Sequence, residues 1–244
     1  MAWSGIVAAG TPWVWLHWAG GEAVCFSAQA DLVGGVVLGA IGVDTLRHVG
    51  RRREYLPLAA LALMFAGHQL VEAFVWWGLQ GHLSDTVADI ATWSYLLFAF
   101  VLLPIYVPAA VFVAEPSGPR RQLIRWSIVV GGIVSALLLA AMARGPVTAS
   151  LDDWHIRYGT GIDAAVLIVG AYIAATCGSL LLSTNRILVR FGLVNLIAVV
   201  VIAIFVIEGF ASLWCAWAAL ASGAVALHLR RGRSAAEGLV SPAV

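Results

Sequence analysis

Apolar stretches separated by short polar connections recur along the whole chain, and their lengths predict helices rather than strands. Most stretches hold about 20 residues, the length that an α-helix needs to cross the hydrocarbon layer of a bilayer. We expect seven such helices, over residues 32–46, 56–79, 85–114, 124–143, 162–182, 191–207 and 209–229. The pattern therefore predicts an all-α membrane protein, a bundle of seven transmembrane helices.

The predicted membrane domain covers residues 26–230 and is followed by a cytoplasmic tail, residues 231–244. Residues 1–25 hold four Trp but no Lys or Arg, so they lack the basic region of a signal peptide. We interpret them as a Trp-rich interfacial segment. The alternative is that translation begins at Val24, in which case residues 1–23 do not belong to the native protein.

Glycines and prolines predict how the helices pack and bend. Gly35 and Gly39 have the spacing of small residues that lets a neighbouring helix approach closely. Pro104 and Pro108 predict kinks in the third helix, because proline removes a backbone donor. Residues 144–160 form the longest polar connection, and we expect it to act as a lid.

Composition supports the membrane assignment, since 61% of residues are hydrophobic, 11% are charged and the mean hydropathy is +0.93. All fourteen basic residues are Arg. Without lysine, a seven-helix protein cannot hold retinal as a Schiff base, so that cofactor is excluded. We expect the lipid bilayer as the main partner, a homo-oligomer as a further one, and no nucleic acid.

The arginines predict an orientation in the membrane. Twelve of the fourteen fall on one side of the seven predicted spans, and only Arg144 and Arg157 fall on the other. Cytoplasmic loops carry the excess of basic residues. The N-terminus is therefore expected outside and the C-terminus in the cytoplasm, in a bacterial cytoplasmic (inner) membrane.

Three polar residues interrupt the second predicted span, and ionisable groups inside a membrane are costly enough to suggest a function. His68 and Glu72 are four residues apart and so share one helix face, and Gln69 lies beside them. A structural explanation competes: a neutral His68 and a hydrogen-bonded Glu72 packed against other helices. Asp31 likewise fits the first turn of a helix, where a carboxylate complements the helix dipole.

A candidate ligand site can be assembled on the outer side from residues of several segments. Its residues are His68, Gln69, Glu72, Glu208, His155 and Asp31. Imidazole and carboxylate groups are ligands that zinc accepts, so a metal set of His68, Glu72, Glu208 and His155 is a second prediction. The spacing matches no recognised metal motif, and no residue is assigned a catalytic role.

Several motifs together carry a resemblance: Cys25-Phe26-Ser27-Ala28, the glycine-rich first span, Pro57-Leu58-Ala59, and His68-Gln69-x-x-Glu72-Ala73-Phe74-Val75-Trp76. They resemble an uncharacterised family of bacterial multi-pass membrane proteins whose members often start Met-Cys-Phe-Ser-Ala or Met-Cys-Trp-Ser-Ala. The resemblance covers mainly residues 25–115. It implies a small seven-span bundle and supports a start at Val24, and it implies no activity.

Three functions remain open. The first is binding or transport of a cation, a proton or a small polar ligand in an outward-facing pocket lined by acids and His. The second is an intramembrane metal-dependent hydrolase, although the seventh span lacks a paired-His motif. The third is a non-catalytic membrane partner or sensor, whose Gly and Ala faces would be helix contacts.

Overall fold

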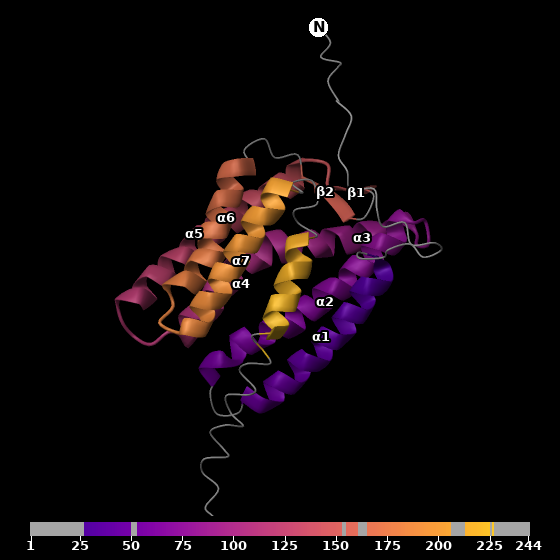
Figure 1. The fold of residues 1–244 in the computed structure, drawn as a ribbon. Coiled ribbons are helices and arrows are strands. Elements are labelled where there is room, and N and C mark those ends of the chain that lie inside the picture. The colour runs from indigo at the N-terminus through magenta and orange to yellow at the C-terminus, as the bar shows by residue number, and fades with distance from the viewer. Residues whose placement is uncertain are drawn as a thin grey trace, which may run out of the picture.

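The computed structural model describes residues 27–49, 53–152, 155–160, 165–205, 213–224 and 226. The predicted N-terminal segment 1–25 and the tail 231–244 lie outside them. Most of the described chain is helical, and the helices pack side by side with a two-stranded hairpin across one end (Figure 1). The elements are α1 (Ala28–Val49), η1 (Arg53–Tyr55), α2 (Leu56–Leu79), α3 (Asp85–Leu96), η2 (Leu97–Leu102), α4 (Leu103–Ala114), α5 (Pro119–Arg144), β1 (Thr148–Asp152), β2 (His155–Gly159), α6 (Ala165–Leu182) and α7 (Arg186–Phe205).

Four helical segments in the described chain are long and apolar enough to cross a membrane: Ala28–Val49, Arg53–Leu79, Asp85–Ala114 and Pro119–Arg144. Two shorter apolar helices are Leu167–Leu182 and Leu213–Ala224, and the latter is here named the C-terminal helix. The predicted second span coincides with α2, and the predicted third span coincides with α3, η2 and α4 together. The predicted seventh span, 209–229, lies partly outside the described residues.

Helix α1 packs closely on α2 through glycines, at the predicted Gly35 and at Gly42; the predicted Gly39 is less tight, since a Cβ atom there would lie 3.6 Å from Ala66 Cβ. A Cβ atom on Gly35 would lie 2.8 Å from Leu70 Cδ2, and one on Gly42 would lie 2.8 Å from the backbone nitrogen of Leu63. These two glycines are two turns apart on one face of α1. The absence of side chains there lets the two backbones approach.

Sequence signals at both ends of α2 explain its length. Pro57 lies in the first turn, where its missing N–H costs no helical hydrogen bond. At the other end Gly81 has φ of 75°, a left-handed conformation that glycine adopts without strain. Gly81 N–H donates to Gly78 O and His82 N–H donates to Trp77 O, the two bonds that close a helix C-terminus in this way.

The third predicted span contains a π-helix, η2, which ends two residues before Pro104; the kinks expected at Pro104 and Pro108 stay a prediction. Such wide turns leave carbonyl groups without their regular helical donors. Side chains of two neighbouring helices supply donors instead, because Ser135 Oγ donates to Val101 O at 2.7 Å and the Tyr172 hydroxyl donates to Ala99 O at 2.6 Å. The irregular segment is therefore held by α5 and α6.

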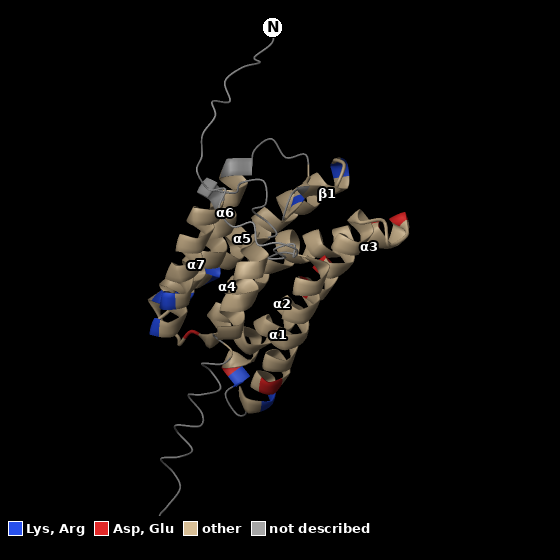
Figure 2. Ribbon diagram, turned by 45° about the vertical axis from the view of Figure 1, so that its right-hand side comes forward, with Lys and Arg blue, Asp and Glu red and all other residues tan. Residues whose placement is uncertain are grey.

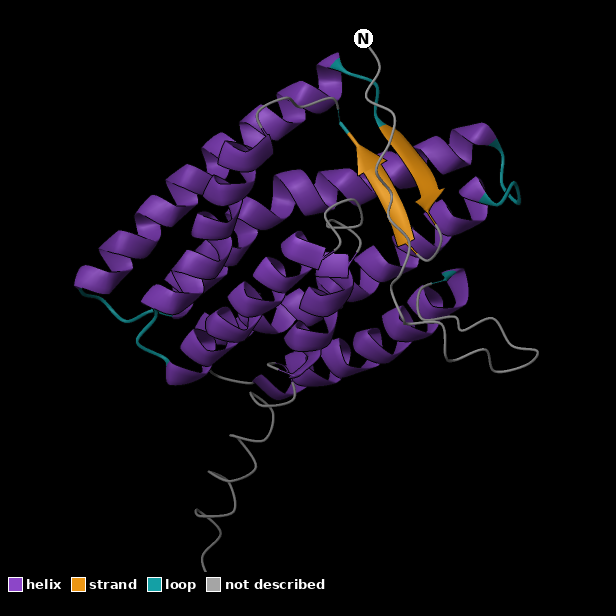
Figure 3. Cartoon of the chain, turned by 45° about the horizontal axis from the view of Figure 1, so that its top comes forward, coloured by secondary structure: helices purple, strands orange, loops and turns teal. Residues whose placement is uncertain are grey.

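The connection between α5 and α6 contains an antiparallel hairpin, which the sequence did not predict. Thr148 pairs with Gly159 and Asp152 pairs with His155, and Figure 3 shows the two strands lying across the helices. Ile156 is fully buried in an apolar cluster with Ala73, Trp76 and Tyr95. The expected polar lid is thus a packed part of the fold, against the second half of α2 and the end of α3.

At the opposite end, buried Glu115 ties two connections together. Its carboxylate accepts from the Ser183 hydroxyl at 2.7 Å and from Thr184 N–H at 2.9 and 3.0 Å. Arg120 Nη1 donates to Ser183 O at 3.0 Å. Basic residues gather at this end of the helices in Figure 2, where α1 ends and α5 and α7 begin.

Candidate ligand-binding site

Two of the predicted binding residues contact each other inside the bundle. Gln69 Nε2 on α2 donates to Asp31 Oδ1 on α1 at 2.8 Å, and the two residues are 6% and 4% exposed. The Trp76 side chain also interacts with this carboxyl. Asp31 Oδ2 and Gln69 Oε1 are buried without a hydrogen-bond partner. A buried acceptor without a donor is costly, so these two oxygens need an explanation beyond the contact between the two side chains.

Asp31 and Gln69 line a cavity of about 630 Å³ between α1, α2, α7 and the C-terminal helix. Its other lining residues are mainly apolar, among them Leu38, Ile41 and Leu213. Trp217 of the C-terminal helix is the third polar contributor, and its buried indole Nε1 has no hydrogen-bond partner. The volume lies within the roughly 300–1,000 Å³ of typical ligand sites.

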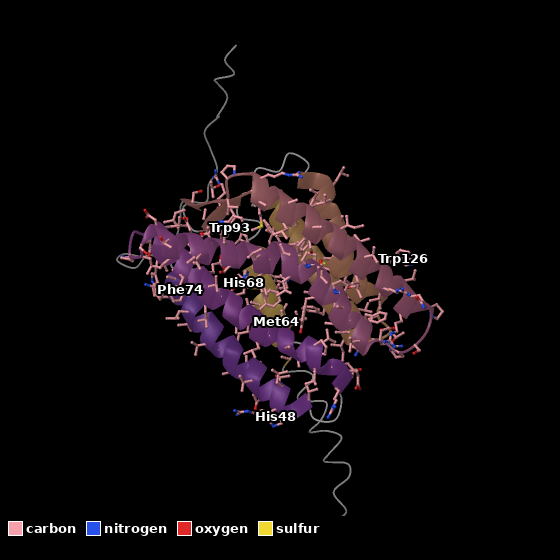
Figure 4. All side chains as sticks on the ribbon, turned by 180° about the vertical axis from the view of Figure 1, so that it is seen from behind. His48, Met64, His68, Phe74, Trp93 and Trp126 are labelled. Atoms are coloured by element: carbon pink, nitrogen blue, oxygen red, sulfur yellow. The ribbon has the colours of Figure 1, made fainter. Side chains whose placement is uncertain are left out.

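His68 lies inside the bundle, whereas Trp126 and His48 lie at its periphery (Figure 4). Its imidazole ring is stacked with Tyr95, with ring centroids 4.1 Å apart, and with Phe98, with centroids 4.3 Å apart. Two rings nearly parallel to the imidazole at these distances must cover its opposite faces. His68 Nε2 is buried without a partner, so the structure places this residue in an aromatic stack rather than against Gln69 or Asp31.

The stack continues into the hairpin. The Tyr158 ring of β2 lies parallel to Tyr95, with centroids 4.4 Å apart and an interplanar angle of 9°. Burial raises the pKa of the Tyr158 hydroxyl well above its ordinary value, and the charges of Glu72, Cys215 and Asp31 raise the pKa further. The hydroxyl itself has no hydrogen-bond partner.

Glu72 lies one turn beyond His68 on α2 and is 1% exposed. It lies within electrostatic reach of Tyr95, Tyr158 and Cys215. Cys215 of the C-terminal helix in turn forms a hydrogen bond with Tyr95. Glu72 therefore belongs to a polar centre made by α2, α3, β2 and the C-terminal helix.

The remaining predicted ligands are less closely connected. His155 is buried at the start of β2, opposite Asp152 in the strand register. Glu208 lies outside the described residues. Within the described ranges, no three His, Cys, Asp or Glu residues form a group that could hold a metal ion. The four-residue zinc set stays a prediction, because one of its members is not described.

Four residues of this region were missed by the sequence analysis: Tyr95, Tyr158, Cys215 and Trp217. Tyr95 lies on the next helix, α3, and the other three lie on elements distant in sequence from α2; Tyr, Cys and Trp side chains also commonly fill apolar cores. Only a knowledge of which helix faces which could have identified them. The one available signal was Tyr158, which lies three residues after the predicted ligand His155.

The described part of the chain is mostly helical. Four of its helices could span a membrane, and buried polar groups lie among them. The chain belongs to the family described as "Family of unknown function (DUF6629)", which matches residues 24–239. Neither a curated protein nor a solved structure shows significant similarity to it. The expected membership of an uncharacterised family is confirmed, while bacterial origin and the N-terminal motif stay predictions.

Proposed function

We propose that the protein is a seven-helix bundle of the bacterial cytoplasmic membrane that binds a cation, or another ligand with N–H donors, at Asp31 and Gln69. Transport of that ligand across the membrane is part of the same hypothesis. The observation that carries the proposal is a pair of buried acceptor oxygens without partners, Asp31 Oδ2 and Gln69 Oε1, on two residues that line a cavity. A positive ligand with N–H donors would donate hydrogen bonds to both oxygens, and its charge would pair with the Asp31 carboxylate.

The number of spans and the orientation can be tested with single cysteines. Ser150 in β1 and Ser117 between α4 and α5 are both exposed. The orientation predicts Ser150 outside and Ser117 in the cytoplasm. In a Cys25→Ser background, a membrane-impermeant thiol reagent added to whole cells should label Ser150→Cys and not Ser117→Cys. The reverse labelling would overturn the orientation.

Binding can be tested on the purified full-length protein in nanodiscs. The probe is ethylammonium, compared with sodium at equal ionic strength, and the readout is the thermal unfolding midpoint. Binding to the folded state raises this midpoint by mass action. Ethylammonium should raise the unfolding midpoint of wild type above its value in sodium. For Asp31→Asn the midpoints in ethylammonium and in sodium should be equal. Asp89→Asn, which alters an exposed carboxylate in the first turns of α3, is the matched control and should behave as wild type. An unchanged response in Asp31→Asn would overturn the proposal.

A second candidate, proton carriage, is favoured by one observation. Both Glu72 and Asp31 act on the pKa of Tyr158, so two buried carboxyl groups lie within electrostatic reach of one phenol. Closely placed acids and phenols can pass a proton along. Proton uptake by proteoliposomes under an imposed potential should then fall in Glu72→Gln and not in Asp89→Asn. Equal uptake by Glu72→Gln and wild type would remove this candidate.

A further inference from the structure

We infer that the cavity beside Asp31 binds the apolar chain of an amphiphile, with a cationic head group at Asp31 and Gln69. This rests on the proposed function and adds the class of ligand. The lining residues of α1 run from Ala30 to Ile41, which at about 1.5 Å per residue is a length of about 16 Å along the helix. Such a slot suits an extended chain better than a compact ion.

The distribution of polar atoms fixes which part of the ligand lies where. Asp31, at the start of the α1 lining, contacts Gln69, so the charged recognition group is at one end of the slot. The lining then continues along α1 with Val37, Leu38 and Ile41, and along the C-terminal helix with Leu220. Water in an apolar slot gains few hydrogen bonds, whereas a hydrocarbon chain loses none.

Exposure indicates the route of entry. Val37 and Leu220 line the cavity, yet they are 54% and 73% exposed at the surface of the bundle. Gly34 also lines it and is exposed, and a Cβ atom there would meet nothing within 4 Å. In a membrane this side of the bundle faces lipid chains, so the ligand enters laterally from the bilayer.

Charge selects the head group. The site offers two unpartnered acceptors, Asp31 Oδ2 and Gln69 Oε1, and one unpartnered donor, Trp217 Nε1. An ammonium head pairs with the carboxylate and donates to both acceptors. A sulfate or phosphate head has no N–H donors and would be repelled by Asp31.

The test uses alkylammonium ions of increasing length, ethyl, hexyl and dodecyl, on the full chain in nanodiscs. Affinity is expressed against the free aqueous concentration of each ion. A chain that enters the cavity should bind about fourfold more tightly per added methylene until the slot is filled, as about 0.8 kcal/mol per buried CH₂ requires. Dodecyl sulfate, with the same chain and the opposite charge, should not compete.

Gly34→Leu adds a side chain at the cavity lining, where its Cβ atom would meet nothing within 4 Å. It should weaken the dependence on chain length, because the added side chain occupies part of the slot. Gly170→Leu is the matched control, because Gly170 on α6 is exposed and its Cβ would also meet nothing within 4 Å. This control should bind all three ions as wild type does.

The outcomes separate the two levels of the proposal. If Asp31→Asn abolishes ethylammonium binding but Gly34→Leu retains the chain-length dependence, the chain lies in the bilayer and the inference fails while the proposed function stands. Equal binding of dodecyl sulfate and dodecylammonium would overturn the head-group assignment. If wild type responds to none of the ammonium ions, the proposed function fails as well.

A wild-type dimer that Gly34→Leu converts to a monomer would show that a second copy fills the slot, and would overturn the inference.

Discussion

The imidazole of His68 is stacked with the phenol ring of Tyr95, with ring centroids 4.1 Å apart and planes inclined by 24°. Phe98 covers the other face, so three aromatic rings from α2, α3 and η2 form one column. The residue that the sequence marked as a ligand is thus held by ring contacts, and its Nε2 has no hydrogen-bond partner. A buried Nε2 atom without a partner is a feature that packing alone does not require.

Substitutions at His68 should separate packing from chemistry. His68→Ala opens a gap between two rings and should lower the free energy of unfolding by about 2–4 kcal/mol. His68→Phe preserves the stack and removes a buried nitrogen without a partner, so it should remain within about 1.5 kcal/mol of wild type. Unfolding in mixed detergent micelles, followed by circular dichroism, measures both values. A His68→Phe protein as unstable as His68→Ala would show that a polar contact of the imidazole is essential.

The carboxylate of Glu115 should stabilise the end of the bundle opposite the hairpin. It accepts hydrogen bonds from Ser183 and Thr184, and hydrogen bonds to a charged group contribute about 1.5–3 kcal/mol each. Glu115→Ala should therefore cost at least about 2 kcal/mol, measured by the same unfolding assay. Glu54→Ala, which removes an exposed carboxylate from η1, is the control and should change stability by less than about 0.5 kcal/mol. Equal effects of the two substitutions would contradict the role given to Glu115.

The boundaries of α2 were predictable because local signals determine them, whereas α1 and α5 begin four and five residues before the predicted spans 32–46 and 124–143. Pro57 and Gly81 fix the two ends of α2, and the predicted span 56–79 coincides with the helix. The hairpin was missed because residues 148–159 lack the Asn-Gly or Asp-Gly turn that marks a short hairpin, and because polar residues prevail among them. Strand formation there depends on packing against α2 and α3, which the local sequence does not reveal.

The site was predictable in part for the same reason. Gln69 stood out because polar residues inside apolar spans are costly, whereas Asp31 lay just before the first predicted span and also fitted a helix first turn; the structure brings the two into contact. His68 and Glu72 share a helix face as expected, but their surroundings differ, since one lies in an aromatic stack and the other near Cys215 and Tyr158. Trp217 and Cys215 could not be found, because an apolar span gives no indication of which neighbour its residues face.

Tyr158 should make stability depend on pH in the alkaline range. Its pKa is raised in the folded protein by burial and by Glu72, so its neutral form is favoured there. The resulting stabilisation is fully present below the unfolded-state pKa of about 10 and is lost as pH rises through the folded-state pKa. The unfolding midpoint of wild type should therefore fall more steeply above about pH 10 than that of Tyr158→Phe. Near neutral pH the two proteins should agree within about 1 kcal/mol, because the hydroxyl has no hydrogen-bond partner to lose. The same slope in both proteins would show that Tyr158 ionises as freely as in the unfolded chain.

Gly131 and Gly132 provide a matched pair for the contact between α4 and α5. A Cβ atom on Gly131 would overlap the carbonyl group of Pro104, whereas one on Gly132 would meet nothing within 4 Å. Alanine favours a helix over glycine by up to about 1 kcal/mol, and both substitutions share that gain. Gly132→Ala should therefore be as stable as wild type or more stable, while Gly131→Ala should lose about 1–3 kcal/mol through the overlap with rigid backbone. Because Pro108 has no N–H for the Pro104 carbonyl, that turn of α4 depends on close packing against α5. Equal stability of the two alanine variants would show that the two helices do not meet at Gly131.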